Sequence, residues 1–456
     1  MHRRLLPHTI GLAVLACATA AAAAPTAQAA WTAPQTLARP AAEQLAATGN
    51  ATQSELFAWK VTTRRRARTP THTGPASFIL TRLRLPGGTL AHSRVVSSAK
   101  ELVANPAVAL DAAGNATVVW AQAGRTIRIM GAHRRSGASF GLPFEIGRTT
   151  AFNGARPAIA VASDGDVSVV WNGGRRIQVA RRPGGRCRAE RPRGCFGEPQ
   201  SLTRGSDHTI ALSRGGTAFV VWAATVRRSR GPGSALRLAI APRGELFGPA
   251  RPIPSPGEAS QPSIAIAPNG NAIIAWRGSL PTGGEQNVDA PILASLRTPA
   301  GVLSATQVVS LLPGSGPQVR TNAQSEAILV WNQRNPTPQN PDGPEVAASV
   351  RRVPDAGFGP PVRLSPAGLA AGSVSLADNA AGTTIAVYSV GPPRNTTPPV
   401  AAAQVMAPGA GFGPAQVIGA EFSGAFAFSA GVRLTVASGG SGGSGGRTLI
   451  SDHAGG

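Results

Sequence analysis

One structural unit of roughly fifty residues repeats along most of this 456-residue chain, and this repeat limits the possible folds more than any other feature. Its clearest mark is a glycine six residues before a tryptophan. Four clear copies are Gly114 with Trp120, Gly165 with Trp171, Gly216 with Trp222, and Gly270 with Trp276. The same offset finds four degenerate copies: Gln53 with Trp59, Ser325 with Trp331, Gly382 with Tyr388, and Gly431 with Ala437. Eight copies of one supersecondary unit are therefore expected, each burying its apolar faces against its neighbours.

Each copy is predicted to contain four short strands. An apolar strand such as 262–266 leads through the turn at Asn269 and Gly270 into a second strand that ends at Trp276. A third apolar stretch such as 127–130 follows, and then a signature of the Phe-Gly-x-Pro type with a short β-like run behind it. The signature begins at Phe140, Phe196, Phe247, Phe358 and Phe412. Because proline cannot donate to a β-ladder, this fourth strand is expected to be the outermost one.

Four-stranded units with both faces apolar are typical of the blades of a β-propeller. The segment 31–37 matches an outer strand that stands alone before the first unit, and the strands expected over 425–429, 432–437 and 447–451 lack an outer strand. We therefore predict an all-β fold: a single eight-bladed β-propeller of four-stranded blades, closed by the N- and C-terminal strands so that no edge stays open. The alternatives are seven blades with an extra hairpin, or an open solenoid.

The repeats resemble those of secreted bacterial β-propellers grouped loosely with the sialidase superfamily, and this resemblance implies fold rather than function. The Asp-box of that superfamily, Ser-x-Asp-x-Gly-x-Thr, places an aromatic residue two or three positions beyond the glycine, whereas the spacing here is six. The single tyrosine, Tyr388, occupies the tryptophan register and is not expected to be a nucleophile. We predict that the repeated aromatic residues pack between blades.

The N-terminus reads as a secretory signal peptide over 1–29, which leaves a propeller domain over 30–456 and predicts a secreted or cell-envelope protein. An alternative is a lipoprotein acylated at Cys17. The two remaining cysteines, Cys187 and Cys195, are expected to form a local disulfide in an oxidising compartment. No later apolar run is long enough for a membrane helix.

The formal net charge is +23, with 44 lysine and arginine residues against 21 acidic ones, and almost all of the positive charge is arginine. A basic exported protein is attracted to anionic surfaces such as cell-wall polymers or acidic glycans, whereas nucleic acid is a less natural partner outside the cell. We expect a monomer, because a closed ring needs no partner to cover its edges.

Long connections between the second and third strands share one face of a propeller, and loops on a rigid scaffold often carry function. Such connections are expected over 61–77, 223–235, 277–290, 332–346 and 391–400. Seven arginines there are candidate ligand-binding residues: Arg64, Arg65, Arg66, Arg68, Arg227, Arg228 and Arg230. A shorter connection adds Arg175 and Arg176 to these candidates. Arginines are also frequent in the opposite connections, for example Arg181, Arg182 and Arg352.

Two function hypotheses follow from this face. Arginine forks could hold the carboxylates or phosphates of an anionic polymer without turnover, which predicts a non-catalytic binding or scaffold module with no cofactor. Alternatively, carboxylates on neighbouring blades could act as acid and base in a propeller-type glycan-active enzyme. The candidates for this second role are Glu285, Asp289, Asp342 and Glu345. Asp164 and Asp166 could bind calcium but are equally ordinary turn residues, so we predict no metal site.

Overall fold

Every named element of the structure is a β-strand. The structure is a computed structural model that describes residues 31–39, 41–98, 102–184, 195–228, 231–280, 288–336, 338, 343–352, 357–392, 399–419, 424–430, 433–439 and 447–453. The signal peptide predicted over 1–29, Cys17 and Cys187 lie outside these residues, so the signal, the lipid anchor and the Cys187–Cys195 disulfide stay predictions. No membrane-spanning helix occurs in the part of the chain that the structure describes.

Most of the strands form four-stranded antiparallel sheets whose strands follow one another in chain order. Two of these sheets come first in the chain: β2 (Glu43–Gly49), β3 (Glu55–Arg68), β4 (Thr73–Arg84) and β5 (Arg94–Val95) form one, and β6 (Leu102–Leu110), β7 (Ala116–Ala123), β8 (Ile127–Arg134) and β9 (Phe144–Thr149) form the other. Two more follow later: one consists of β17 (Ala259–Ile266), β18 (Ala272–Leu280), β19 (Val288–Arg297) and β20 (Gln307–Ser310), and the other of β21 (Gly314–Thr321), β22 (Ala327–Arg334), β23 (Pro344–Arg351) and β24 (Val362–Arg363). A fifth sheet consists of β25 (Ala370–Asp378), β26 (Thr384–Gly391), β27 (Val400–Met406) and β28 (Gln416–Gly419).

One sheet has seven strands, because a single long strand takes part in two consecutive units. It runs β10 (Ala158–Val161), β11 (Val167–Asn172), β12 (Arg176–Arg182), β13 (Gln200–Leu212), β14 (Ala218–Arg228), β15 (Gly231–Ala241) and β16 (Arg251–Pro252). The first half of β13 pairs with β12, and its second half, from Gly205 onward, pairs with β14. The outer strand of one unit thus continues directly into the inner strand of the next.

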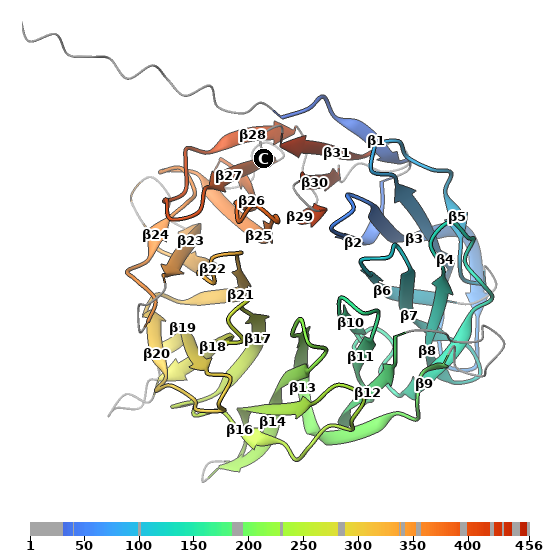
Figure 1. The fold of residues 1–456 in the computed structure, drawn as a ribbon, viewed down its shortest axis with the longest axis horizontal. Coiled ribbons are helices and arrows are strands. Elements are labelled where there is room, and N and C mark those ends of the chain that lie inside the picture. Colours follow the sequence, from blue (N-terminus) through green and yellow to red (C-terminus); the bar gives the residue numbers. More distant parts are fainter. Residues whose placement is uncertain are drawn as a thin grey trace, which may run out of the picture.

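The two ends of the described chain meet in the last four-stranded sheet. Its order is β1 (Gln35–Ala38), β31 (Thr448–His453), β30 (Arg433–Gly439) and β29 (Gly424–Ala430), with Gln35 opposite Ile450. The N-terminal strand therefore supplies the outer strand of the C-terminal sheet, as the sequence predicts. Figure 1 shows the sheets following one another around a ring, with β2, β6, β17, β21 and β25 toward the centre and strands such as β5 and β20 at the rim. This arrangement is propeller-like.

The turn between the first and second strands has the same geometry in seven units. In each, the residue in the glycine register adopts a left-handed conformation, which glycine accepts at little cost. The φ values are +82° at Gly114, +86° at Gly382, +60° at Gln53 and +64° at Ser325. The amide of this residue donates to the carbonyl three positions earlier, as Gly114 does to Asp111 at 3.0 Å. The degenerate copies found by the six-residue offset are thus true structural equivalents, whereas Gly431 lies outside the described residues.

The aromatic residues of the repeat lie between the sheets, which confirms the packing role predicted for them. Trp120, Trp171, Trp222, Trp276, Trp331 and Tyr388 are all fully buried. The Tyr388 hydroxyl donates to the carbonyl of Leu364 at 3.1 Å, and burial raises the pKa of Tyr388 to about 12, so it stays a neutral donor. Apolar clusters join adjacent sheets; one cluster, for example, holds Ile129 of β8 together with Val169 of β11.

The inner strands are linked around the ring by side chains at β-bulges. Gln44, Asp207 and Gln261 each sit at such a bulge with positive φ. Gln44 Oε1 accepts the amide of Asn105 at 2.7 Å, and Gln261 Oε1 accepts the amide of Gly316 at 2.8 Å. Because each bond joins one sheet to the next, these bulges help to hold the sheets in register around the axis.

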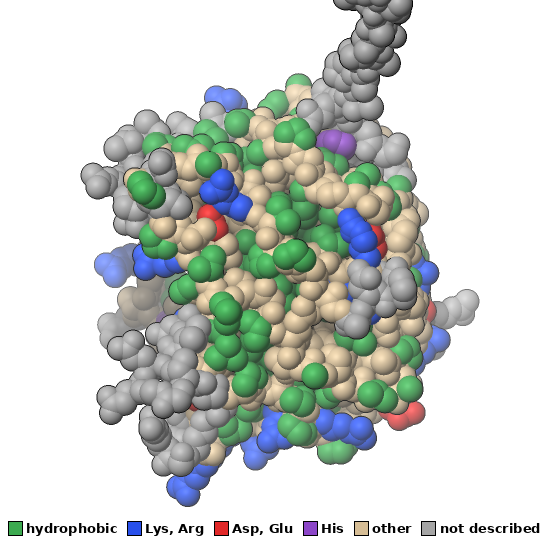
Figure 2. Space-filling model, turned by 90° about the vertical axis from the view of Figure 1, so that its left-hand side faces the viewer, with side chains coloured by type: hydrophobic (Ala, Val, Ile, Leu, Met, Phe, Trp, Pro, Cys, Tyr) green, Lys and Arg blue, Asp and Glu red, His purple; other side chains and the backbone are tan. Residues whose placement is uncertain are grey.

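The outer strands form the rim, as the proline positions predict. In the Phe-Gly signature, the phenylalanine is buried at Phe196, Phe247 and Phe358, and the glycine amide returns to the third strand, as Gly248 does to the carbonyl of Ile240 at 3.0 Å. The outer strands at the rim are short, and they carry side chains of different chemical types. Figure 2 shows one side of it, where basic side chains are scattered among apolar ones and acidic side chains are few.

Several connections expected to be loops are instead extensions of their strands. β3 and β4 continue as a ribbon to the pair Arg68 and Thr73, and β14 and β15 continue to the pair Arg228 and Gly231. The expectation of long loops at 61–77 and 223–235 was therefore wrong. The reason is that antiparallel pairing satisfies the backbone groups of both strands, which an irregular loop of that length would leave to solvent.

Candidate functional site

The β3–β4 ribbon reaches across the neighbouring sheet. Its turn is closed by Thr69, whose amide donates to the carbonyl of His72 at 2.8 Å and whose hydroxyl accepts the amide of His72 at 3.0 Å. At this tip, Thr71 Oγ1 donates to the carbonyl of Gly124, in the β7–β8 turn, at 3.0 Å. The His72 ring lies 4.9 Å from the ring of Phe152, in the segment that leads from β9 to β10. The ribbon is therefore anchored at its far end and does not depend on its own sheet alone.

The anchored ribbon carries three of the predicted arginines. Arg64, Arg65 and Arg66 are exposed, and within the described residues no carboxylate lies within ion-pairing distance of any of them. Arg68 ends β3, and the side chains of Arg68 and Arg228 are outside the described set, as is the whole of Arg230. A row of exposed guanidinium groups without acidic partners is a source of uncompensated positive charge.

A second pair of predicted arginines lies close to the same anchor. Arg175 in the β11–β12 turn and Arg176 at the start of β12 are exposed, and Arg176 Nη1 donates to the carbonyl of Leu202 at 3.2 Å. The segment that contains Phe152 packs on this turn, because Thr149 Oγ1 donates to the carbonyl of Asn172 at 2.7 Å. The segment from Thr149 to Ala155 therefore contacts the tip of the arginine ribbon through Phe152 and contacts Asn172, beside the Arg175 turn, through its two ends. Arg227 is exposed on the β14–β15 ribbon, and the described contacts do not connect it to the other two groups.

Three arginines at the opposite ends of the strands, Arg181, Arg243 and Arg352, have partners in a neighbouring sheet. Arg181 Nη1 donates to the carbonyls of Pro242 and Glu245, both at 2.7 Å. Arg352 Nη2 donates to the carbonyl of Ala410 at 2.7 Å, and Arg243 Nη2 lies 2.6 Å from Asp164 Oδ2. These guanidinium groups tie one sheet to the next. The structure thus separates two sets of arginines that are alike in sequence: one is engaged in packing, and the other faces solvent.

The acidic residues proposed for the enzyme hypothesis are only partly described. Glu285 and Asp342 lie outside the described residues, and Asp289 is placed only by its backbone pairing with Ser279. The Glu345 side chain is buried, accepts a hydrogen bond from Gln333 Nε2, and lies 3.9 Å from Arg363 Nη1. This carboxylate is held inside its sheet, so its surroundings are those of a structural group. The acid–base assignment stays a prediction.

Asp164 and Asp166, the two carboxylates considered as calcium ligands, both lie close to the guanidinium group of Arg243. Arg243 Nη2 pairs with Asp164, and Arg243 Nε lies 3.5 Å from Asp166 Oδ2. The described residues hold no group of three or more histidine, cysteine, aspartate or glutamate side chains placed to bind a metal ion.

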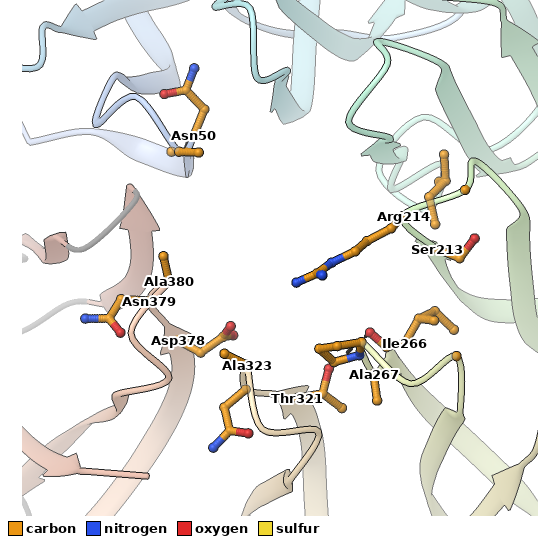
Figure 3. Close-up of a pocket in the computed structure, with 17 residues that line it drawn as sticks. Asn50, Ser213, Arg214, Ile266, Ala267, Thr321, Ala323, Asp378, Asn379 and Ala380 are labelled. Carbon is orange, nitrogen blue, oxygen red and sulfur yellow. Dashed lines mark hydrogen bonds between the residues drawn. The ribbon is translucent and has the colours of Figure 1, made fainter.

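A pocket that the sequence analysis did not anticipate lies at the centre of the ring. We call it the axial pocket: it has a volume of about 540 Å³ and is lined by the first turns of five units, at Asn50, Arg214, Pro268, Ala323 and Ala380, and by Asp378. Figure 3 shows Arg214 extending from its turn into the pocket, with Asp378 on the opposite wall. Burial raises the pKa of Asp378 to about 6, although the charge of Arg320 acts in the other direction. Arg214 lies in the β13–β14 turn, and Asp378 is the last residue of β25, directly before the β25–β26 turn. The repeat pattern locates both turns, but nothing in the sequence shows that they face each other.

No family model and no curated protein matches this sequence. The solved structures that align with it share little sequence with it. An ulvan lyase classed as a polysaccharide lyase aligns at 10% identity and a TM-score of 0.48, over 76% of this chain and 93% of its own. The NanB sialidase of Streptococcus pneumoniae, as a point mutant, aligns at 7% identity and a TM-score of 0.40, over 79% of this chain and 66% of its own. The β-propeller domain of the trilobed protease of Pyrococcus furiosus aligns at 8% identity and a TM-score of 0.43, over 82% of this chain and 95% of its own.

Proposed function

We propose that the chain is exported after loss of residues 1–29 and that residues 30–456 form one eight-bladed propeller that binds an anionic polymer without turning it over. In this count the seven-stranded sheet is two blades that share β13, and β1 completes the eighth blade. The ligand class is a polymer with repeated carboxylate or phosphate groups, such as a cell-wall polymer or an acidic glycan. Its binding surface is the arginine ribbon of β3 and β4 together with the neighbouring Arg175 turn.

One observation supports this proposal above the others: Arg64, Arg65 and Arg66 are exposed and have no acidic partner among the described residues. At the opposite ends of the strands, by contrast, Arg181, Arg243 and Arg352 are engaged by groups of a neighbouring sheet. An unpaired guanidinium can form a bidentate, charge-assisted contact with a carboxylate or phosphate without first breaking an internal bond. The anchor at Thr71 and His72 holds the ribbon in place, which lowers the ordering cost of binding.

The test is polymer binding by purified protein that covers residues 30–456. Polyglutamate, hyaluronate and polyphosphate are presented beside uncharged dextran, at low and high salt. In the ribbon variant, Arg64, Arg65 and Arg66 are each changed to Gln. We expect this variant to bind the anionic polymers about tenfold or more weakly, since charge-assisted hydrogen bonds contribute on the order of 1.5–3 kcal/mol each before screening.

The matched control removes the same charge from the rim. Arg94, Arg251 and Arg363 are exposed on the outer strands β5, β16 and β24. The three Arg→Gln changes there should leave binding within about twofold, because screening limits the reach of a distant charge to about 10 Å. Equal losses in both variants would show that binding follows total charge and would reject the ribbon as a site. Release of shortened chains from any polymer would replace this proposal with the enzyme hypothesis.

A further inference from the structure

The axial pocket and the arginine ribbon lie at opposite ends of the strands. The axial pocket is formed by turns between the first and second strands, whereas the ribbon connects the second strand to the third, so the two features occupy opposite faces of the ring. The turns around the pocket are held by local backbone bonds, such as those from Gly216 to Ser213 and from Ser325 to Asn322, both at 3.0 Å. The pocket is therefore preformed, and its volume is within the range of small-molecule sites, roughly 300–1,000 Å³.

Two opposite charges stand on facing walls of this pocket. Arg214 is exposed, and its side chain points toward the middle of the cavity (Figure 3). Within the described residues, no carboxylate forms an ion pair with Arg214, and Asp378 forms none with a cationic side chain. The other charged group that acts on Asp378 is Arg320, on the adjacent inner strand. Burial raises the pKa of Asp378 above its ordinary value, which means that its negative charge is incompletely compensated.

This pair of charges restricts the chemistry of a ligand. A neutral molecule in the pocket would take solvent from both groups and compensate neither. A simple anion would be attracted by Arg214 but repelled by Asp378, whereas a simple cation would be attracted by Asp378 but repelled by Arg214. A molecule with separate positive and negative ends satisfies both groups at once.

We propose that the axial pocket binds a small zwitterion, with its carboxylate on Arg214 and its ammonium group on Asp378. This site is independent of the polymer-binding surface proposed above, because it uses other residues on the other face. Short unmodified peptides are suitable probes, since one main-chain unit adds a known distance of about 3.3–3.6 Å between the two charged ends.

The experiment is calorimetric titration of the protein with alanine and with linear oligoalanines of two to five residues at pH 7.5. We expect saturable binding that is strongest at one length, because only one separation of the charged ends matches the pocket. For that peptide, the N-acetylated and the C-amidated forms should each bind about tenfold more weakly, which is the loss of one charge-assisted contact, about 1.4 kcal/mol.

Two variants assign the ends. Arg214→Gln should weaken the unmodified peptide about tenfold and remove the penalty of C-amidation, while keeping the penalty of N-acetylation. Asp378→Asn should do the reverse. The controls are Arg64→Gln and Glu245→Gln, which remove exposed charges outside the pocket and should leave peptide binding unchanged.

The proposal is overturned if no peptide in the series binds saturably, or if capping either end has no effect on binding. It is also overturned if both pocket variants lose binding to capped and uncapped peptides alike while their thermal unfolding matches the unmodified protein. Polymer binding by the ribbon is measured on the same samples. Because Arg214 and Asp378 take no part in that surface, failure of one proposal is distinguishable from failure of the other.

Discussion

At the level of single residues, His133 shows how a contact between two sheets determines the charge of a side chain. Arg182 Nη2 lies 3.0 Å from His133 Nε2, and Thr117 Oγ1 lies 3.2 Å from His133 Nδ1. Because a guanidinium can only donate, His133 Nε2 accepts and Nδ1 holds the proton. Burial, together with the charge of Arg182, lowers the pKa of His133 to about 4. Asp111 acts in the other direction and Arg135 in the same one as Arg182, so the imidazole is neutral in the folded protein at pH 7.

This lowered pKa predicts a pH-dependent loss of stability. The folded-state pKa is below the ordinary value of 6.5, so the contribution is fully present above pH 6.5 and is lost as the pH falls through about 4. The free energy of unfolding should therefore drop by on the order of 1–3 kcal/mol more in the unmodified protein than in His133→Gln between pH 7 and pH 4. Denaturant titrations at several pH values measure this difference. A stability difference between the two proteins that does not change with pH would contradict the lowered pKa of His133. The pKa of His208 is also lowered by burial, but both proteins contain His208, so its contribution cancels in the comparison.

At the level of elements, the repeated turn explains why the degenerate copies still fold. Gln53 and Ser325 adopt the same left-handed conformation as the glycines of the other copies. A side chain in that region costs energy, because its Cβ atom crowds the backbone. The turn tolerates this cost because its hydrogen bonds and the adjacent buried strands determine the conformation; Gln53, for example, donates its amide to the carbonyl of Asn50 at 3.0 Å. Sequence alone locates the turn through its spacing, even where the glycine is missing.

Restoring the glycine should therefore stabilise the protein. Gln53→Gly is expected to raise the free energy of unfolding by about 0.5–1 kcal/mol, because it removes the steric cost of the left-handed conformation. Gln53→Ala keeps a Cβ atom and should give no such gain, which makes it the matched control. Denaturation midpoints of the two variants, compared with that of the unmodified protein, test this prediction. An equal effect of Gly and Ala would show that the Gln53 side chain, and not the backbone conformation, determines the cost.

At the level of the whole molecule, the first and last described sheets are joined by a buried ionic network. Arg84 on β4 donates to both oxygens of Asp452 on β31, at 2.7 Å each, and lies 3.3 Å from Glu55 Oε2. Thr435 Oγ1 lies 2.8 Å from both Glu55 Oε1 and Asp452 Oδ1. Burial alone would lower the pKa of Arg84, but Asp452 and Glu55 reverse the effect and raise it. The β1–β31 pairing and this network therefore act on the same seam.

Breaking the network should weaken the molecule at that seam. Asp452→Asn leaves a buried guanidinium with one carboxylate fewer and is expected to lower the free energy of unfolding by about 3 kcal/mol or more. Asp164→Asn removes the partner of a much more exposed arginine and should cost no more than about 1 kcal/mol. Hydrogen exchange at Leu37 and Ile450 reports on local opening. Similar losses in the two variants, with unchanged exchange there, would show that the network does not hold the ends together.

The repeat period, the shared turn, the buried register of Trp120 and its equivalents, the outer position of the Phe-Gly strand and the pairing of the two ends all follow from the sequence. These features depend on contacts within a hairpin or on which strand is missing from each end, and both are encoded by local spacing. Only the tertiary structure distinguished the exposed Arg64 from the engaged Arg181 and placed Arg214 across from Asp378. Those relations join side chains from different sheets, and the physical reason they escape sequence analysis is that residues one or more repeats apart meet only when the sheets are arranged around the ring.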